Sequence, residues 1–430
     1  MKRPASAGPT ASAETSMAKI APARLAAFEI LTLVGEGKGH SDELLHSPRM
    51  DALSPEDRNL TTALVMGVLR WQIALDARVR SLLQRPEQRL ADPVSLTLRL
   101  GAFQLLHLDR IPAHAALGES VELCRAAGEP HATGMVNAVL RKLAAAQRPG
   151  QRVFESVAAF SERLGHPQWL VERWVAAYGR ETALKICEAD QKEPAAGTLF
   201  SENGGNLPQM DDGSRLVAEL AAAAMPTAKA VWDCCAAPGG KTLILAHRLT
   251  SAEIVATDIS AKRLAQTEAR FRRYAYAERI RCAVADAAAS GDEQFDLILC
   301  DVPCSGTGTL AGNPEIRHRL KPEEFARQAI RQRAILSATL KRLAPGGRLV
   351  YSTCSLEPEE CERIVEDVIG DANVRRIPVE GLIQNLAESA VLRDGSGLSS
   401  AVHDGVLRTL PGVQNCDGFF AAIFQRDDSK

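Results

Sequence analysis

The first third of the chain has the hydrophobic spacing of α-helices. Between Ala18 and Ala146, apolar residues recur every three or four positions, so that they share one face of a helix. Proline residues fall between the periodic blocks and separate them. Ser54, followed by Pro55 and two acids, has the composition of a helix N-cap. The pattern predicts an all-α domain with helices over 23–34, 57–83, 94–108, 113–127 and 134–146.

The pattern changes near Ala230 to short aliphatic runs that alternate with helical segments. Each run is four to seven residues long and is closed by turn residues, which is typical of buried strands. Alternation of strand and helix predicts a mostly parallel sheet covered by helices. The predicted strands lie over 231–235, 253–258, 295–299 and 348–351, with a further strand that ends at Asp286. Helices are predicted before them over 168–178, 180–189 and 214–224.

These two patterns predict a multidomain protein, with an all-α domain followed by an α/β domain. Residues 1–17 are rich in Ala, Ser, Pro and Gly without an apolar core, which predicts a disordered tail. The all-α domain then covers 18–148. A linker and a small helical subdomain cover 149–227, and the α/β domain covers 228–430.

Composition describes an ordinary soluble protein and narrows the classes of partner. Of the 430 residues, 46% are apolar and 24% are charged. The formal net charge is −2, so any nucleic acid must be bound by local patches of positive charge. Arginines are frequent in the all-α domain, where they form either a solvated surface or a phosphate-contacting one. They are Arg70, Arg78, Arg80, Arg85, Arg89, Arg99 and Arg141.

Cysteine spacing and hydropathy indicate the cellular compartment of the protein. Ten cysteines are present and none forms a C-x-x-C pair, which argues against zinc and predicts reduced thiols in a cytoplasmic protein. Since apolar runs of 18 residues are absent from the sequence, we predict no membrane span. The sequence indicates no obligate protein partner.

Three strand ends carry groups suited to a nucleoside. The loop 235–241 contains Gly239 and Gly240 between a strand and a helix, where backbone N–H groups can approach a ligand closely. A P-loop would need glycine at Cys235, so that motif is excluded. Asp258 ends the next strand, 18 positions after Gly240, and can accept hydrogen bonds from ribose hydroxyls. Asp286 ends the third strand and can bind an adenine amino group. Together they predict a nucleoside pocket.

Two cysteines follow two further strands. Cys304 lies in the stretch 301–308, which begins with Asp301, and Cys354 lies between Thr353 and Ser355. Free cysteines are often small buried hydrophobes. Here, however, both loops are built from turn residues and hydroxyls, and ligands bind beyond the carboxyl ends of strands in open α/β sheets. The two thiols are therefore predicted to face one reactive pocket.

The motifs now resemble a known family. The loop 235–241, the stretch 301–308 and residues 353–355 are similar to those of S-adenosylmethionine-dependent RNA cytosine-5 methyltransferases. Residues 98–102, 109–115 and 136–141 resemble the domain related to the antiterminator NusB. This combination is similar to the bacterial 16S ribosomal RNA methyltransferase B family, and the resemblance extends over nearly the whole chain from about Ala18.

The resemblance implies a NusB-like amino-terminal domain and a Rossmann-like methyltransferase domain that methylates carbon 5 of a cytosine in 16S ribosomal RNA. It implies that Cys354 is the nucleophile and that Cys304 assists release. It further implies that S-adenosylmethionine is bound by Cys235, Ala236, Ala237, Pro238, Gly239, Gly240, Lys241, Asp258, Arg263, Asp286 and Asp301. No metal site is implied.

Two other functions stay open at this point, and one segment departs from the family. The alternatives are a transfer-RNA cytosine-5 methyltransferase and a non-catalytic RNA-binding or antitermination-like factor. Between Gly197 and Asp211 the family carries a longer insert that contacts RNA, whereas this chain has about a dozen residues and lacks the expected Arg-x-Asn near Thr198.

Overall fold

The computed structural model describes residues 20–146, 155–194, 197–201, 206–369, 374–393 and 397–427. The tail predicted over 1–17, most of the predicted linker and part of the shortened insert lie outside these residues. The chain divides into two compact units. We call the first the helical unit (residues 1–173 with 313–318) and the second the sheet unit (residues 174–312 with 319–430).

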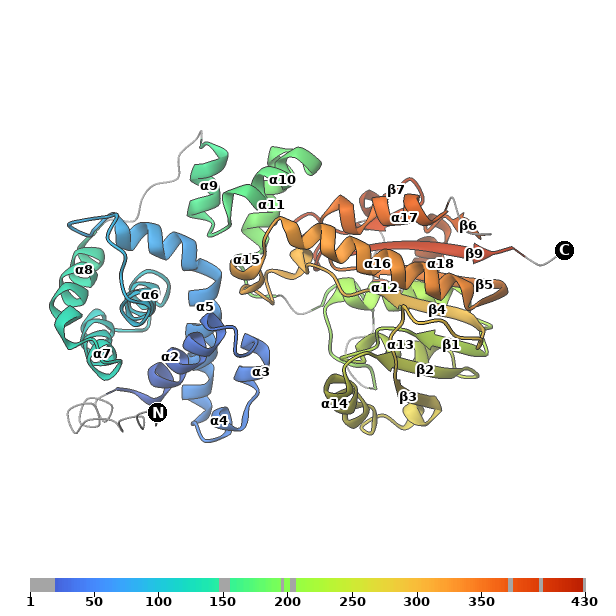
Figure 1. Cartoon of the computed structure of the whole chain (residues 1–430), viewed down its shortest axis with the longest axis horizontal. Helices are drawn as coiled ribbons and strands as arrows, with labels where there is room; N and C mark the ends of the chain where they lie inside the picture. The colour runs from blue at the N-terminus through green and yellow to red at the C-terminus, as the bar shows by residue number, and fades with distance from the viewer. Residues whose placement is uncertain are drawn as a thin grey trace, which may run out of the picture. The chain divides into compact units, whose positions relative to one another are not determined.

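The helical unit contains a bundle of helices that confirms the predicted ones (Figure 1). Ser54 caps α5, since its hydroxyl accepts a hydrogen bond from the Asp57 backbone N–H at 3.1 Å. The helices are α2 (Pro22–Gly35), α3 (Ser41–Leu45), α4 (Pro48–Asp51), α5 (Pro55–Arg80), α6 (Asp92–His107), α7 (Ala113–Ala126), α8 (Thr133–Ala145) and α9 (Val157–Arg163), with the 3-10 turn η1 (Pro130–Ala132).

The helical unit is held together by apolar helix faces. Leu64 and Val68 of α5, Leu100 of α6 and Leu140 of α8 are fully buried in one cluster. Burying one such side chain contributes about 1.5–3 kcal/mol. The unit also includes Asn313–His318, where Arg317 donates to the carbonyls of Arg70 and Gly165 at 3.2 Å each.

The sheet unit contains a nine-stranded sheet in the order β3-β2-β1-β4-β5-β9-β8-β7, with β6 also paired to β9. Strands β1 to β5 pair with one another in parallel, as predicted, whereas β9 pairs antiparallel with β5 and, together with β6 to β8, adds antiparallel pairs that the sequence pattern did not predict. The strands are β1 (Ala230–Asp233), β2 (Glu253–Asp258), β3 (Ile280–Val284), β4 (Phe295–Asp301), β5 (Leu343–Thr353), β6 (Val374–Ile377), β7 (Val402–His403), β8 (Val406–Arg408) and β9 (Phe420–Arg426).

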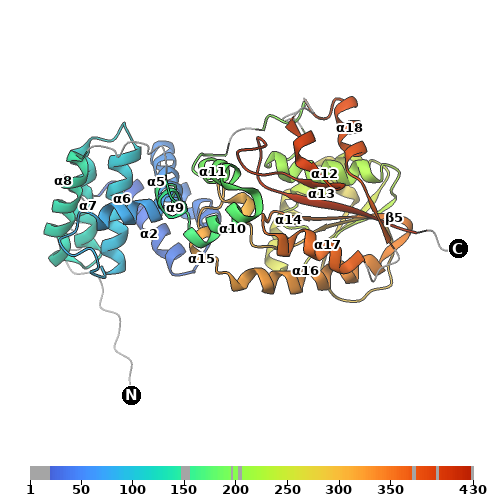
Figure 2. The ribbon, with the colours of Figure 1, turned by 90° about the horizontal axis from the view of Figure 1, so that it is seen from above.

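Helices cover both faces of this sheet, as Figure 2 shows. One face packs against α12 (Asp212–Ala224), α13 (Gly240–Arg248) and α18 (Glu380–Glu388), and the other against α16 (Glu323–Lys341) and α17 (Glu362–Ile369). The remaining helices are α10 (Gln168–Tyr178), α11 (Arg180–Ala189), α14 (Ala261–Phe271) and α15 (Ile316–Arg319), with the short turns η2 (Ala275–Arg279), η3 (Thr307–Thr309), η4 (Pro358–Glu360) and η6 (Ser399–Ala401).

The strand order places a ligand site at a defined edge. From β1 the chain proceeds outward to β2 and β3, and then returns to the other side of β1 as β4. Ligands in open α/β sheets bind beyond the carboxyl ends of the strands at this point of reversal. The loops that follow β1, β2, β4 and β5 therefore meet at one edge of the sheet.

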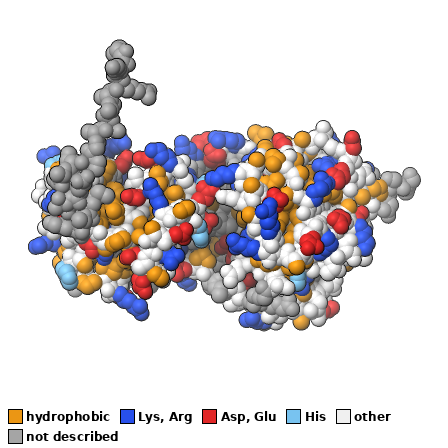
Figure 3. Space-filling model, turned by 90° about the horizontal axis from the view of Figure 1, so that it is seen from below, with side chains coloured by type: hydrophobic (Ala, Val, Ile, Leu, Met, Phe, Trp, Pro, Cys, Tyr) orange, Lys and Arg blue, Asp and Glu red, His pale blue; other side chains and the backbone are white. Residues whose placement is uncertain are grey.

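The surface has mixed charge. On the face drawn in Figure 3, Lys and Arg side chains are interspersed with Asp and Glu side chains, in agreement with the net charge of −2. Among the described residues, none of the helices combines the length and apolarity that crossing a membrane requires.

Candidate active site

The loop that follows β1 is a close-packed cradle. The Ala236 N–H donates to the Thr257 carbonyl at 2.8 Å and thereby ties the loop to the end of β2. Gly239 has a φ of +90°, and a Cβ at this position would lie 2.6 Å from side-chain atoms of Thr267 and Phe271. Only glycine fits this conformation and this space. The loop therefore presents backbone at the start of α13, as the sequence predicts.

Acidic side chains stand at the ends of β2 and β3. Asp258 is almost fully buried, and its Oδ1 accepts from the Ser260 N–H at 2.8 Å. Asp286 is exposed, and its Oδ1 accepts from the Ala288 N–H at 2.9 Å. A buried carboxylate beside a glycine-lined loop fits a ribose diol, because carboxylate oxygens have several acceptor positions. The residues at this edge thus fit the nucleoside part of a cofactor.

Arg263 lies at this edge but is directed at the protein. Its Nη2 donates to the Ala237 carbonyl at 2.7 Å, and its Nη1 lies 3.6 Å from Asp258 Oδ2. Arg270 lies about two turns further along α14, and it likewise donates to the Pro238 carbonyl at 3.3 Å. In this structure both guanidinium groups support the loop 235–241 from the side of α14.

Lys241 connects the loop of β1 to the end of β4. Its Nζ lies 2.8 Å from Asp301 Oδ2, while Ser352 donates to Asp301 Oδ1 at 2.7 Å. Burial opposes the ammonium charge, but the attraction of Asp301 and its hydrogen bond outweigh it and raise the pKa of Lys241. Lys241 is consequently a fixed cation beside the two cysteine loops.

Asp233, at the end of β1, was not predicted to be a functional residue. It is almost completely buried, and it accepts a hydrogen bond from Thr242 of α13 at 2.6 Å. Burial raises the pKa of Asp233 to about 7, with a further contribution from Asp301. The only sequence signal for it is its position at a strand end.

The two predicted thiols meet at this same edge. Strands β4 and β5 are parallel neighbours in which Asp301 pairs with Ser352, so both loops leave the sheet at one level. As a result, Cys304 Sγ lies 3.2 Å from Cys354 Sγ. Both side chains are half-buried.

A backbone contact locks the two loops together. The Gly308 N–H donates to the Cys354 carbonyl at 2.9 Å. A Cβ at Gly308 would lie 2.2 Å from the Gly418 carbonyl oxygen and 2.9 Å from that of Cys354. Such distances require glycine, so the turn residues seen in the sequence permit the close approach of the two loops.

The environment of Cys354 favours the thiol over the thiolate. The hydrogen bond with Cys304 and burial raise the pKa of Cys354 well above its ordinary value, whereas the Lys241 charge lowers it. A nucleophilic thiol must ionise, and an added positive charge in the pocket would assist it.

The arginines of the helical unit differ from one another in exposure. Arg70 is buried, and Arg99 forms a two-pronged ion pair with Asp76 at 2.7 Å, so neither is available to a phosphate. By contrast, Arg80, Arg85, Arg89 and Arg141 are exposed. The sequence could not separate these two groups, because the positions of the arginines in the sequence do not show which of them the fold buries or pairs.

Comparisons with known proteins find two matching families. The family described as 16S rRNA methyltransferase RsmB/F matches residues 222–425, and the NusB family matches residues 21–145. The chain is 30% identical to the probable ribosomal RNA small subunit methyltransferase B of Bacillus subtilis, over 93% of this chain and 98% of that protein.

Two further similarities extend over most of the chain. The ribosomal RNA small subunit methyltransferase B of Xanthomonas campestris pv. campestris is 31% identical, over 96% of this chain and 98% of that protein. The crystal structure of the protein PH0851 has the same fold, with a TM-score of 0.71 and 19% identity, over 95% of this chain and 99% of that one.

Proposed function

The chain belongs to the 16S rRNA methyltransferase RsmB/F family, and from that membership we propose that it methylates carbon 5 of a cytosine in 16S ribosomal RNA through Cys354. The observation that carries the proposal is the pair of thiols, 3.2 Å apart, at the strand edge that also holds the loop 235–241 and Asp258. S-Adenosylmethionine is the cofactor that this family uses as its methyl donor.

The chemistry of cytosine explains the need for a thiol. Carbon 5 is a poor nucleophile, so it does not take a methyl group directly. When the Cys354 thiolate forms a bond to carbon 6, the ring electrons move towards carbon 5 and make it nucleophilic, which splits one difficult step into two easier ones. S-Adenosylmethionine, when bound, supplies the methyl group and the positive charge of its sulfonium.

The second half of the reaction requires the thiol to leave. After methylation, carbon 5 carries both the methyl group and its original proton. A base removes that proton, the electron pair restores the ring double bond, and the bond between carbon 6 and Cys354 breaks. Cys304, whose sulfur lies beside that of Cys354, is placed to assist this release by hydrogen bonding or proton transfer to the departing sulfur.

Attack by Cys354 rather than Cys304 is what the family resemblance implies. The Lys241 charge opposes the rise in the pKa of Cys354 that burial and the neighbouring Cys304 cause. Lys241 is in turn held by Asp301 at 2.8 Å. We propose that Asp301 orients the cofactor or the edge of the base through this arrangement.

We propose that the cofactor lies along the ends of β1, β2 and β3. Asp258 would accept hydrogen bonds from the ribose diol, and Asp286 would bind the adenine amino group. The backbone of the loop 235–241 would hold the methionine part, because this loop leads into the amino-terminal end of α13. Arg263 would act by holding the Ala237 carbonyl and Asp258.

The target base must leave its stack before it can reach the thiols, at a cost of a few kcal/mol. Phosphate contacts can offset this cost. The exposed Arg272 and Arg273 follow α14 in the sheet unit, and Arg80, Arg85 and Arg89 are exposed in the helical unit. We propose that these side chains contact the RNA backbone.

A labelling experiment tests the proposed function. The protein would receive S-adenosylmethionine with a radioactive methyl group together with deproteinised 16S RNA, assembled small subunits or transfer RNA in parallel. We expect label on 16S RNA, and nuclease digestion should release it as 5-methylcytidine. Label in transfer RNA alone, or in another nucleoside, would reject the proposal, as would binding of cofactor and RNA without transfer.

A further inference from the structure

A buried carboxylate connects the two cysteine loops. Glu360 lies in η4, six residues after Cys354, and its side chain is fully buried. Its Oε1 accepts from the Ser305 N–H at 2.9 Å and from Gln332 Nε2 at 3.1 Å. Its Oε2 accepts from the hydroxyls of Ser305 and Ser355. Four donors thus converge on one carboxylate.

The two serines that bind Glu360 each follow a thiol. Ser305 comes directly after Cys304, and Ser355 comes directly after Cys354. Their hydroxyl oxygens lie 3.1 Å apart. One carboxylate therefore binds the residue that directly follows each cysteine and so connects the two loops.

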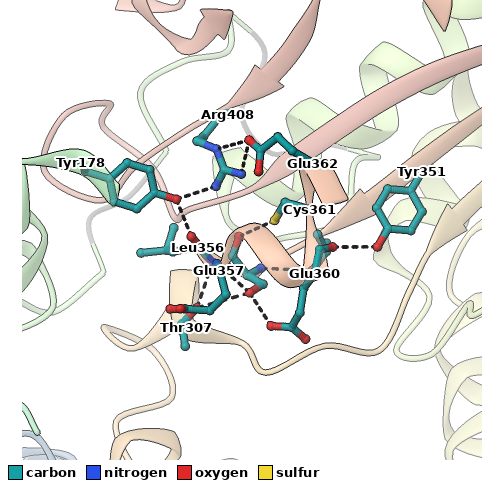
Figure 4. Close-up of polar contacts among 11 residues, drawn as sticks. Tyr178, Thr307, Tyr351, Leu356, Glu357, Glu360, Cys361, Glu362 and Arg408 are labelled. Carbon is teal, nitrogen blue, oxygen red and sulfur yellow. Dashed lines mark hydrogen bonds and ion pairs between the residues drawn. The ribbon is translucent and has the colours of Figure 1, made fainter. Parts of the chain in front are cut away.

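Glu360 is itself fixed from two directions. The Tyr351 hydroxyl of β5 donates to the Glu360 carbonyl at 2.7 Å, as drawn in Figure 4. Gln332 of α16, besides binding the carboxylate, donates to the Pro303 carbonyl at 3.0 Å. The residues on both sides of Cys304 are consequently held by groups of this one cluster.

The donors explain why the residue is an acid. All four partners donate, and they are neutral groups. A carboxylate has only acceptor positions and can accept from all four donors, whereas the NH₂ group of a glutamine would force the serine hydroxyls to reverse their hydrogen bonds. Burial raises the pKa of Glu360, while the hydrogen bonds from Ser305 and Ser355 lower it. The neighbouring Arg408 pairs with Glu362 (Figure 4).

We propose that Glu360 is a positioning residue that sets the spacing of the Cys304 and Cys354 thiols. The inference rests on the proposed function, because attack by one thiol and release assisted by the other need both sulfurs at the same cytosine. A displacement of about 1 Å in an active site can cost about 100-fold in rate. A loss of even part of this cluster should therefore reduce the rate of the chemical steps rather than cofactor binding.

The first test compares two buried acids of the same segment. Glu360→Gln should lower kcat by at least about tenfold and leave KM for S-adenosylmethionine within about twofold of wild type. Glu360→Asp, which keeps the acceptors, should recover part of the rate. The matched control is Glu357→Gln. Glu357 is also buried, but its carboxylate accepts from the Trp174 indole at 3.0 Å, and a glutamine oxygen can do the same.

The second test measures thiol spacing without any substrate. Diamide takes two electrons and two protons from a pair of thiols and is reduced to the hydrazine, while a disulfide forms. Wild type and the Glu357→Gln variant should form the Cys304–Cys354 disulfide quickly, as followed by mass spectrometry of the joined peptides. Glu360→Gln should form it at least about tenfold more slowly, because exchange requires the sulfurs to be in contact.

The two tests together separate the inference from the proposed function. If wild type does not methylate cytosine, the proposed function fails, and the diamide rates still test Glu360. Equal diamide rates in wild type and Glu360→Gln would overturn the positioning role, whatever the activity. If Glu360→Gln does not fold, Ser355→Ala removes one of the four hydrogen bonds, and it should slow disulfide formation in the same direction.

Discussion

The two units of this protein differ in what they bury. The helical unit is built from apolar helix faces, and its buried cations, such as Arg24 and Arg317, bind neighbouring acceptors within that unit. The described part of the helical unit buries the carboxyl group of Glu315, whereas the sheet unit buries several at its strand ends and loops, among them Asp233, Asp258 and Glu360. Raising the pKa of Asp233 from 3.8 to about 7 opposes folding by about 4 kcal/mol at neutral pH.

This difference indicates where chemistry resides. Helices can pack through apolar faces without a buried acid. The surface residues of a helical unit can therefore change with little loss of stability. A strand edge that buries carboxylates loses stability, and such a loss is typical of functional sites. We therefore expect changes in the sheet unit to affect the reaction itself and changes in the helical unit to affect substrate affinity.

The largest expected effect is the loss of Cys354. Without its sulfur no bond to carbon 6 can form, so Cys354→Ala should lower methyl transfer by at least about 10³-fold. It should also leave no RNA–protein complex on a denaturing gel. Radioactive methyl transfer and gel electrophoresis measure the two results.

Cys304→Ala is the matched comparison for that variant. Attack and methyl transfer can still occur, but release is slowed, so a covalent protein–RNA complex should accumulate and should require S-adenosylmethionine. The opposite pattern, with a complex in Cys354→Ala and none in Cys304→Ala, would exchange the two roles. Full activity in both variants would exclude covalent catalysis.

The next effect concerns the cofactor. Hydrogen bonds to a charged group contribute about 1.5–3 kcal/mol each. Asp258→Ala should therefore weaken S-adenosylmethionine binding by at least about 100-fold, as measured by calorimetry. The protein should still melt cooperatively. Asp292→Ala, which changes an exposed acid before β4, is the control, and wild-type affinity in Asp258→Ala would remove Asp258 from the site.

A smaller effect is expected in the helical unit. Arg80, Arg85 and Arg89 are exposed at the end of α5 and just beyond it, and Lys142 of α8 contacts the same segment through the Leu82 carbonyl at 3.4 Å. Replacing the three arginines by serine should weaken RNA binding. Each lost phosphate contact should also reduce the slope of the logarithm of the binding constant against the logarithm of the salt concentration by about 1.

The same triple variant should keep its maximal rate at saturating RNA, which separates binding from chemistry. Arg49→Ser, an exposed arginine that pairs with Glu29 at 3.3 Å, serves as a control for the loss of surface charge. An unchanged affinity and salt slope in the triple variant would mean that this surface of the helical unit does not contact RNA.

The sequence predicted what depends on local pattern. Periodicity gave the long helices of the helical unit, the helices α10 to α12 and the five parallel strands, and strand ends gave Cys304 and Cys354 as neighbours. The antiparallel strands were missed. β7 and β8, with two and three residues, are too short to show a period, whereas the seven-residue, mostly apolar run of β9 was not assigned to a strand.

Glu360 could not have been found from sequence. It stands next to Glu359 and Glu362 in a run that is typical of a solvated helix start. Its burial results from Ser305 and Gln332, which lie 55 and 28 positions away. Only the fold brings these residues together, and the same reason explains why the burial of Arg70 was not predicted.

The last effect we predict is on stability, and it has opposite signs in the two units. His318 belongs to the helical unit, and its Nε2 donates to the Leu69 carbonyl at 2.6 Å. Burial lowers the pKa of His318 from 6.5 to about 4. Because the folded state then binds fewer protons than the unfolded state, the contribution of His318 to stability is lost as the pH falls below 6.5. At pH 5 the loss is at most about 2 kcal/mol.

In the sheet unit the sign is reversed. Burial raises the pKa of Asp233 to about 7 and that of Asp417 to about 8. The folded state binds more protons there, so these acids cost stability as the pH rises from about 4 to about 8. Thermal unfolding followed by calorimetry should show both effects as shifts of the unfolding temperature, with the larger shift caused by the two acids. His318→Gln can still donate to the Leu69 carbonyl but cannot titrate. This variant should therefore remove the loss of stability that His318 causes below pH 6.5 and leave the effect of the two acids unchanged. The same loss of stability below pH 6.5 in that variant would mean that another group in the protein is responsible.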